Sequence, residues 1–396
     1  MNALSAVAEV AGAFLKLGLT SFGGPIAHLS YIRAECVQTR GWLGDDEYAD
    51  IVALCQFLPG PASSQVVFAI GMQRAGLAGA LAASLCFLLP SAALMIAFAY
   101  GVTALGDLHG AGWRYGLKLA AVAVVAQAVW GMGVKLCPDR PRLTLCLAAA
   151  AATLIFPGAL GQVGVIVGGA AVGCWLYRDL PDPVSPTVVE RARGHVAAVA
   201  ALVAFAVLLV APRLVAPATG AKSVDVFDAF YRPGALVFGG GHVVLPLLRE
   251  AIIPRGWMSD DAFLAGYGAA QAVPGPLFSF AGYLGAIIHG GPHAWTGGLW
   301  CLFAIFLPGW LLIGGALPFW HRLRSKAWMQ AALRGANAAV VGVLLAALYT
   351  PVMAEAVTNA RDLAAALVAF GLLELWKAPP WLVVLLTAAA GQWALR

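Results

Sequence analysis

Uninterrupted apolar stretches of about 20 residues, the length at which a helix spans the hydrocarbon of a bilayer, recur from one end of this chain to the other. Only 11% of its 396 residues are charged, against roughly 25% in soluble domains, so the chain cannot cover a water-facing surface. The first stretch also lacks the basic start of a cleaved signal peptide. We therefore predict an all-α polytopic membrane protein with about 10–13 transmembrane segments.

The apolar segments alternate with short polar intervals. The most polar interval carries three prolines and charges of both signs, a composition typical of a linker. It predicts a first domain at 1–178, a linker at 179–194 and a second domain at 195–396. The apolar segments lie near 3–22, 47–73, 76–101, 113–136, 142–158, 160–177, 195–216, 222–247, 261–288, 296–318, 328–350, 357–375 and 379–395.

The two domains repeat each other, the strongest signal in the sequence. A shift of 216 residues lays Lys16 on Arg232, Gly18 on Gly234, Phe22-Gly23-Gly24 on Phe238-Gly239-Gly240 and Arg33 on Arg249. A shift of 215 lays Trp42 on Trp257, Asp45-Asp46 on Asp260-Asp261, Gln56 on Gln271 and Pro59-Gly60-Pro61 on Pro274-Gly275-Pro276. One ancestral unit was duplicated and fused.

Duplicated membrane units are either parallel or inverted, and the number of crossings decides which. If every segment crosses, seven precede the second unit and it is inverted. If 47–73 is a re-entrant hairpin broken at its Pro-Gly-Pro, only six cross and the repeat is parallel. The distribution of Lys and Arg between the two faces favours neither arrangement.

Pro-Gly-Pro should break each helix and leave backbone amides unpaired at membrane depth, which is tolerated only around a protein-lined cavity. The free N–H groups at the start of the following half-helix attract anions. Hydrogen-bonding side chains flank both breaks, so we predict an oxyanion site rather than two simple kinks. These side chains are Gln56, Ser63, Ser64, Gln271 and Ser279.

Two further repeated features are candidates for the same site. Adjacent glycines in Phe22-Gly23-Gly24-Pro25 and Phe238-Gly239-Gly240-Gly241 allow a ligand to approach the backbone, or two helices to pack closely. A cation in an apolar segment is a functional candidate by default, and both copies keep one, as Lys16 and Arg232. We expect no acidic residue close in sequence to neutralise them, which suggests an anionic ligand; the alternative is that they extend to the headgroups.

The remaining polar residues have plainer explanations. Asp45-Asp46 and Asp260-Asp261 precede helices, where we expect them to serve as N-caps. Arg33 and Arg249 lie near helix ends and are as compatible with a solvated role as with a substrate gate. His28 and His242 have no counterparts in the other repeat.

Several function classes lack their signatures. There is no basic patch for nucleic acid, no phosphate-binding loop for ATP, and no catalytic cluster that would make the chain an enzyme. The seven cysteines occur singly without C-x-x-C, as buried apolar residues do, so neither a metal nor another cofactor is expected.

The stretches FLKLGLTSFGGPIAHL and CQFLPGPASSQ, with their counterparts YRPGALVFGGGHVVLPLL and AAQAVPGPLFSFAGYLGA, resemble the long-chain chromate ion transporter family. The resemblance spans both halves. It implies chromate efflux across the cytoplasmic membrane, hence chromate resistance, and two antiparallel domains, which favours inverted repeats with a cytoplasmic N-terminus. The family motifs map onto Phe22-Gly23-Gly24-Pro25, onto Gln56 with Pro59-Gly60-Pro61, and onto their second-half partners. Gly241 in place of Pro25, and Phe278 in place of Ser63, make any two-fold site imperfect.

These features predict a secondary transporter in which the half-helices after the two Pro-Gly-Pro breaks bind the dianion near midplane, aided by the glycine turns and by Lys16 or Arg232. Membrane potential or an ion gradient would drive export. An uptake transporter for sulfate or another oxyanion is the alternative. Transport direction, coupling ion and oligomeric state stay open.

Overall fold

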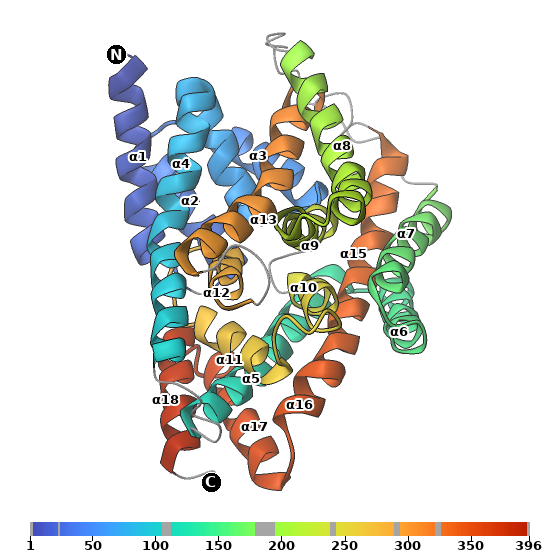
Figure 1. The fold of residues 1–396 in the computed structure, drawn as a ribbon. Helices are drawn as coiled ribbons and strands as arrows, with labels where there is room; N and C mark the ends of the chain where they lie inside the picture. Colours follow the sequence, from blue (N-terminus) through green and yellow to red (C-terminus); the bar gives the residue numbers. More distant parts are fainter. Residues whose placement is uncertain are drawn as a thin grey trace.

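The computed structural model describes residues 3–22, 24–104, 112–178, 195–237, 243–288, 294–320 and 326–393, and within these residues the secondary structure is entirely helical (Figure 1). The first repeat contains α1 (Ala3–Thr20), α2 (Gly24–Arg33), η1 (Ala34–Thr39), α3 (Asp45–Phe57), α4 (Ala62–Ala104), α5 (Gly112–Leu136), α6 (Arg140–Ile155) and α7 (Ala159–Leu176). The next helix, α8 (His195–Thr219), precedes the second repeat. That repeat contains α9 (Lys222–Leu236), α10 (Val244–Ile252), α11 (Asp260–Ala270), η3 (Leu277–Ser279), α12 (Phe280–Ile287), α13 (Ala294–Ala316), η4 (Leu317–Phe319), α15 (Ala327–Ala347), η5 (Leu348–Met353), α16 (Ala354–Ala356), α17 (Ala360–Glu374) and α18 (Pro380–Trp393).

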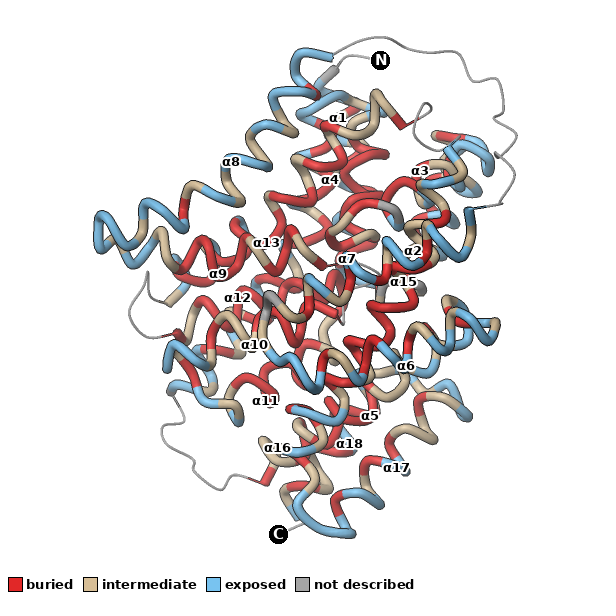
Figure 2. The backbone as a smooth tube through the Cα atoms, turned by 90° about the vertical axis from the view of Figure 1, so that its right-hand side faces the viewer, coloured by how far each residue is buried: buried red, intermediate tan, exposed pale blue. Residues whose placement is uncertain are grey.

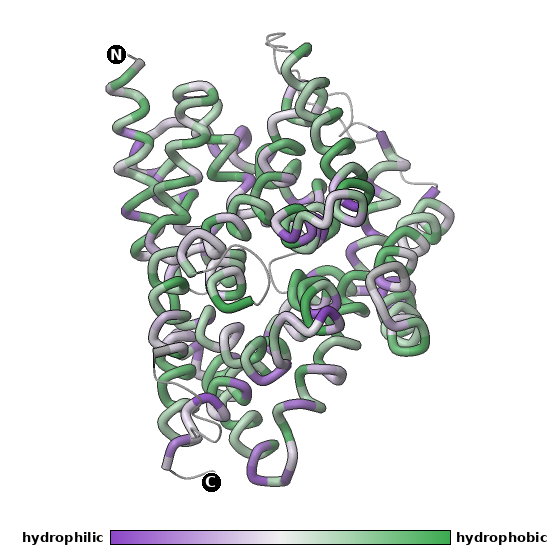
Figure 3. The backbone as a smooth tube through the Cα atoms, in the orientation of Figure 1, coloured by the Kyte–Doolittle hydropathy of each residue, from purple (hydrophilic) through white to green (hydrophobic). Residues whose placement is uncertain are grey.

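The prediction of a helical, multi-pass membrane protein is confirmed. Among the described residues, five stretches are long and apolar enough to cross a bilayer: Ala62–Thr103, Gly112–Leu136, His195–Thr219, Ala294–Phe319 and Ala327–Ala356. Hydrophobic residues occupy most of the backbone tube, with hydrophilic positions scattered between them (Figure 3). The predicted linker at 179–194 lies outside the described residues.

Several predicted apolar segments are pairs of short helices rather than single spans. Segment 47–73 divides at Pro59-Gly60-Pro61 into the 13-residue α3 and the start of α4, and segment 261–288 divides at the second Pro-Gly-Pro into α11 and α12. Helices of 13 and 11 residues reach only about 20 Å and about 16 Å, less than the hydrocarbon thickness of about 30 Å. A further break inside α4, at Gly76 with φ +64°, separates its first short arm from a long second part.

The short helices fold back on each other. Tyr283 of α12 donates its hydroxyl to the Ala262 carbonyl of α11 at 2.9 Å, and the Phe263 and Phe280 rings lie 5.3 Å apart. In the first repeat, Lys16 of α1 contacts Glu35 at 2.7 Å, so η1 lies beside the second half of α1. The repeats are therefore built from helical hairpins, and one hairpin in each repeat carries Pro-Gly-Pro at its tip.

The two repeats exchange their last helices. Gly116 of α5 packs directly on the backbone of Thr387 in α18, and the equivalent Gly335 of α15 packs on the backbone of Gly169 in α7. In both places a side chain would overlap a facing carbonyl, so glycine is needed for the close approach. Buried residues concentrate where the repeats meet, while α6, α8 and α17 present many exposed positions (Figure 2).

Candidate functional site

The hairpin tips of the two repeats meet at the centre of the molecule. The Gly275 amide donates to the Ser21 carbonyl at 2.8 Å, and the Gly60 amide donates to the Val237 carbonyl at 2.7 Å. Ser21 and Val237 are equivalent residues, each directly before its Phe-Gly-Gly. The Pro-Gly-Pro of each repeat is thus bonded to the glycine turn of the other, and the two bonds are reciprocal.

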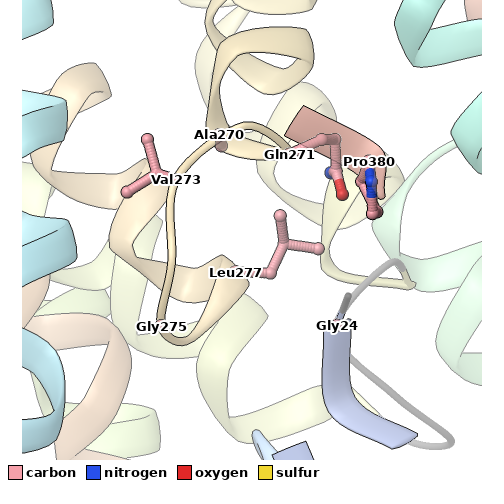
Figure 4. Close-up of a pocket in the computed structure, with 7 residues that line it drawn as sticks. All are labelled: Gly24, Ala270, Gln271, Val273, Gly275, Leu277 and Pro380. Carbon is pink, nitrogen blue, oxygen red and sulfur yellow. The ribbon is translucent and has the colours of Figure 1, made fainter. Parts of the chain in front are cut away.

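A pocket opens beside one of these crossings (Figure 4). It is lined by Gly24 at the start of α2, by the second Pro-Gly-Pro segment and by the start of α18, and its cavity volume is about 20 Å³, room for about one water molecule. The Gln271 amide lies next to Pro380, and Leu277 projects between Gln271 and Gly24. The lining residues are Gly24, Ala270, Gln271, Val273, Gly275, Leu277 and Pro380.

Backbone conformation explains why glycine occupies both Pro-Gly-Pro centres. Gly60 has φ +129° and Gly275 has φ +99°, values that side-chain-bearing residues rarely adopt. The surroundings differ: a Cβ on Gly275 would lie 2.8 Å from the Ser91 hydroxyl, whereas one on Gly60 would lie 2.6 Å from the Gln65 amide nitrogen. Gly309, the residue equivalent to Ser91, faces Pro61 instead.

Several buried polar atoms of the motif segments and of the helices next to them have no hydrogen-bond partner. A buried polar group left unpaired costs about 1–3 kcal/mol, so such atoms indicate where a polar ligand or water binds. Among the described residues these atoms include the hydroxyls of Ser21, Ser64 and Ser84, His28 Nδ1, Gln65 Oε1 and Gln271 Nε2.

The predicted site residues do not all converge. Gln271 lines the pocket and Ser279 is buried at the end of η3, while Ser63 and Ser64 are buried in the first turn of α4. Gln56 is exposed, and Phe22 is half-buried at the first tip. The predictions on Gly23, Phe238, Gly239 and Gly240 lie outside the described residues, as does the side chain of Pro25.

Both intramembrane cations have acidic partners, contrary to our expectation. Lys16, whose side chain is 61% exposed, pairs with Glu35 at 2.7 Å, and the Arg232 Nε donates to Asp228 at 2.7 Å. The Arg232–Asp228 pair could have been recognised, because residues four apart share a helix face; Glu35 is too distant in sequence. Lys16, with Arg40, holds the pKa of Glu35 below its usual range.

The acidic pairs after the tryptophan turns are not N-caps, and this prediction was wrong. Gly44 and Ser259 occupy the N-cap positions. The aspartates that follow them form ion pairs instead: Arg33 with Asp45 at 2.6 Å and Arg249 with Asp260 at 2.6 Å. The first turn places both carboxylates beside the arginine of the preceding hairpin.

A second repeated cluster was missed altogether. Arg40 lies 3.7 Å from Glu9 and 5.2 Å from the Trp42 ring, and Arg255 lies 3.8 Å from Asp225 and 5.3 Å from the Trp257 ring. Only Trp42 and Trp257 were recognised as equivalent from the sequence; the Arg40 and Arg255 alignment was available at the same shift. In each repeat the cluster joins the first helix, α1 or α9, to the tryptophan-containing segment that follows the hairpin.

The comparisons with known proteins agree with one another. The family model described as Chromate transporter matches residues 8–174 and 224–392. A protein of Pseudomonas aeruginosa named chromate transport protein is 30% identical over 95% of this chain and 89% of its own length. A probable chromate transport protein of Synechococcus elongatus is 27% identical over 96% of this chain and 93% of its own. A chromate transport protein of Cupriavidus metallidurans is 26% identical over 84% of this chain and 80% of its own. No solved structure matches the chain significantly.

All seven cysteines are free, and no group of three or more metal-ligating side chains occurs within the described part of the chain. The duplicated match reproduces the two repeats that the sequence predicts.

Proposed function

Because this chain belongs to the chromate transporter family, we propose that it carries chromate, a tetrahedral dianion resembling sulfate, across the cytoplasmic membrane. The observation that carries this proposal is the reciprocal bonding of each Pro-Gly-Pro glycine to the residue before the other repeat's Phe-Gly-Gly, in a structure where buried polar side chains of the same segments have no hydrogen-bond partner. Such tips present backbone amides and neutral donors to an anion at membrane depth. The activity is that of a transporter rather than an enzyme.

The proposed binding site lies between the tips. The Gln271 amide and the start of α2 at Gly24 form one wall; the first turn of α4, with Ser63 and Ser64, supplies equivalent donors in the other half. Phe22, Gly23, Pro25 and the second turn at Phe238, Gly239 and Gly240 complete the site by equivalence. Gln56, Pro59, Pro61, Pro274, Pro276 and Ser279 shape its edges.

Lys16 and Arg232 can contribute to this site only if their ion pairs open. Lys16 and Arg232 reach an anion only by releasing Glu35 and Asp228. Removing Arg232 alone would leave the Asp228 carboxylate, 6% exposed, without its partner, which typically costs about 3–5 kcal/mol. The informative variant is therefore the double change Asp228→Asn with Arg232→Gln, compared with Lys16→Gln. Unchanged chromate affinity in both would remove these cations from the site.

An inside-negative potential suffices to drive export. At about 2.3 kcal/mol per charge per 100 mV, a dianion gains about 4.6 kcal/mol, roughly three decades of concentration. Export at that gradient would confer chromate resistance on the cell.

The test is chromate flux in proteoliposomes with a clamped potential. Outward flux should rise as the interior becomes more negative, and sulfate should compete. Flux independent of potential would contradict the electrogenic mechanism. Chromate sensitivity instead of resistance on expression would favour uptake of sulfate or another oxyanion.

We further infer that the repeats are inverted. If the hairpins α1 with α2 and α3 with the first arm of α4 re-enter without crossing, three long helices precede the second repeat: the second part of α4, α5 and α8. If α6 and α7 both cross as well, they add two crossings, so the number of crossings before the second repeat stays odd. In support, α5 rises from lower left to right in Figure 1 while the equivalent α15 descends.

Labelling from one side of oriented vesicles tests this topology. Thr39 and Pro254 are exposed and occupy equivalent positions beyond the hairpins. In a background without native cysteines, Thr39→Cys and Pro254→Cys should react with an impermeant thiol reagent from opposite faces. Reaction from the same face would mean parallel repeats.

A further inference from the structure

His28 is a buried titratable side chain near the pocket that the proposed mechanism does not use. It is 1% exposed and lies on α2 four residues after Gly24, a residue that lines the pocket. Residues four apart share one face of a helix. A buried ionisable residue inside a membrane protein marks a functional site by default.

The immediate contacts of His28 connect it to both repeats. Its ring lies against the backbone of Ser21, whose carbonyl accepts the Gly275 amide of the second repeat at 2.8 Å. The ring packs edge-on against Phe87, with centroids 5.7 Å apart. The Phe87 carbonyl in turn lies 3.5 Å from the position of a Cβ on Gly275. His28 therefore lies at the crossing between the first glycine turn and the second Pro-Gly-Pro.

One ring nitrogen of His28 is left over. Nδ1 has no hydrogen-bond partner, and the nearby hydroxyls of Ser21 and Ser84 are also buried and unpartnered. An unpaired imidazole nitrogen in such a place costs free energy unless something binds it. A proton is the smallest species that can, and it converts the ring into a cation with donors at both nitrogens.

Charged side chains occur on the elements around α2, but none of those described acts on His28. Burial disfavours the charged form of its ring, and no described charge offsets this. The long second part of α4 and the segment from Gln271 to Phe280 contain no charged residue. The charged groups on the elements around α2 are Glu9, Lys16, Arg33, Glu35, Asp45, Asp46, Glu47, Asp50 and Arg74; Lys16 pairs with Glu35, Arg33 with Asp45, and Arg74 with Glu9.

We propose that His28 is a proton-binding site coupled to the oxyanion site, so that a proton on His28 and a dianion in the pocket stabilise each other. This inference rests on the proposed function. The imidazolium attracts the dianion across a medium of low dielectric constant. Reciprocity requires that the anion strengthen proton binding by the same factor as the proton strengthens anion binding. The equivalent residue in the second repeat is Val244, so each chain carries one such site.

The direction of the pH effect follows from this coupling. Anion affinity is highest where His28 is protonated and falls as the pH rises, by up to about tenfold per pH unit if one proton is linked. Where binding occurs with His28 initially neutral, chromate must bring a proton with it. That proton uptake distinguishes a linked site from a histidine that only fills space.

The experiment measures proton uptake on chromate binding to the purified full-length protein in nanodiscs. Titration calorimetry in two buffers of different ionisation enthalpy, at pH values from about 6 to about 8 and with the ionisation of chromate itself subtracted, reports the protons bound per anion. The wild type should take up protons, and His28→Gln and His28→Asn should not. His195→Gln, at the exposed start of α8, is the matched control and should behave as the wild type.

Each result decides the matter. Chromate binding by the wild type without proton uptake would overturn the proposal, whatever the variants do, and so would equal uptake in a folded His28→Gln protein. Retained chromate binding with lost proton uptake in either variant supports it. Absence of any chromate binding by the wild type would instead contradict the proposed function on which it rests.

Discussion

The two repeats share their backbone connections and differ in their side chains. Each Pro-Gly-Pro glycine donates to the other repeat's glycine turn, and each repeat closes its hairpins with an arginine–aspartate pair. The polar residues at the first tips have apolar counterparts: His28 matches Val244, Gln65 matches Phe280 and Ser84 matches Leu302. Duplication therefore preserved the scaffold, while these three polar side chains occur in the first half alone.

The largest effect is expected where the repeats exchange helices. Replacing Gly335 or Gly116 with Leu would drive a side chain into the backbone of α7 or α18, and overpacking a close helix contact typically costs about 1–3 kcal/mol or more. We expect loss of monodisperse protein on size exclusion. The control is Gly131→Leu on α5, where a Cβ meets no atom within 4 Å. If all three variants behave alike, the glycine contacts do not hold the repeats together.

The two Pro-Gly-Pro glycines should differ in tolerance. Alanine at either position strains the backbone by about 1–3 kcal/mol, enough to reduce chromate flux on the order of tenfold or more. We expect Gly275→Ala to be worse, because Ser91 bonds the Leu88 carbonyl at 2.9 Å and cannot move freely, whereas Gln65 ends in a flexible amide. Adding Ser91→Gly, which copies Gly309, should partly restore flux in Gly275→Ala. No rescue would mean that the strained φ alone accounts for the loss.

The smallest effect is expected for the two equivalent ion pairs Arg33–Asp45 and Arg249–Asp260, which should differ in their contribution to stability. Arg249 and Asp260 make two hydrogen bonds, at 2.6 and 2.9 Å, and are 25% and 22% exposed; Arg33 and Asp45 are 46% and 61% exposed. Exposed pairs contribute about 0–1 kcal/mol and bidentate, less exposed ones more. Double-mutant cycles on thermal unfolding in detergent should give the larger coupling for Arg249–Asp260. Equal couplings would contradict this burial argument.

The sequence predicted the helical membrane fold, the duplication and the positions of the motifs, because apolar length and helix breakers act locally. The hydrogen bond between Ser21 and Gly275 could not be predicted, since it joins segments far apart in the chain. Asp45 and Asp260 were misassigned because the preference of aspartate for helix starts does not reveal an arginine supplied by the preceding hairpin. Glu35, the partner of Lys16, lies too far along the chain to be predicted. Asp228, the partner of Arg232, lies four residues away and could have been predicted.

The exchange of helices also bears on how such a chain arose. In the first repeat, α5 packs against α18 of the second repeat, and in the second repeat α15 packs against α7 of the first. Each of these two helices therefore depends on the other repeat for its close packing partner. A precursor consisting of one repeat would have left these helix faces open as a single copy, and two copies related by a two-fold axis would have closed both. Fusion then joined partners that already fitted, and it allowed one copy to lose polar residues that the other retained.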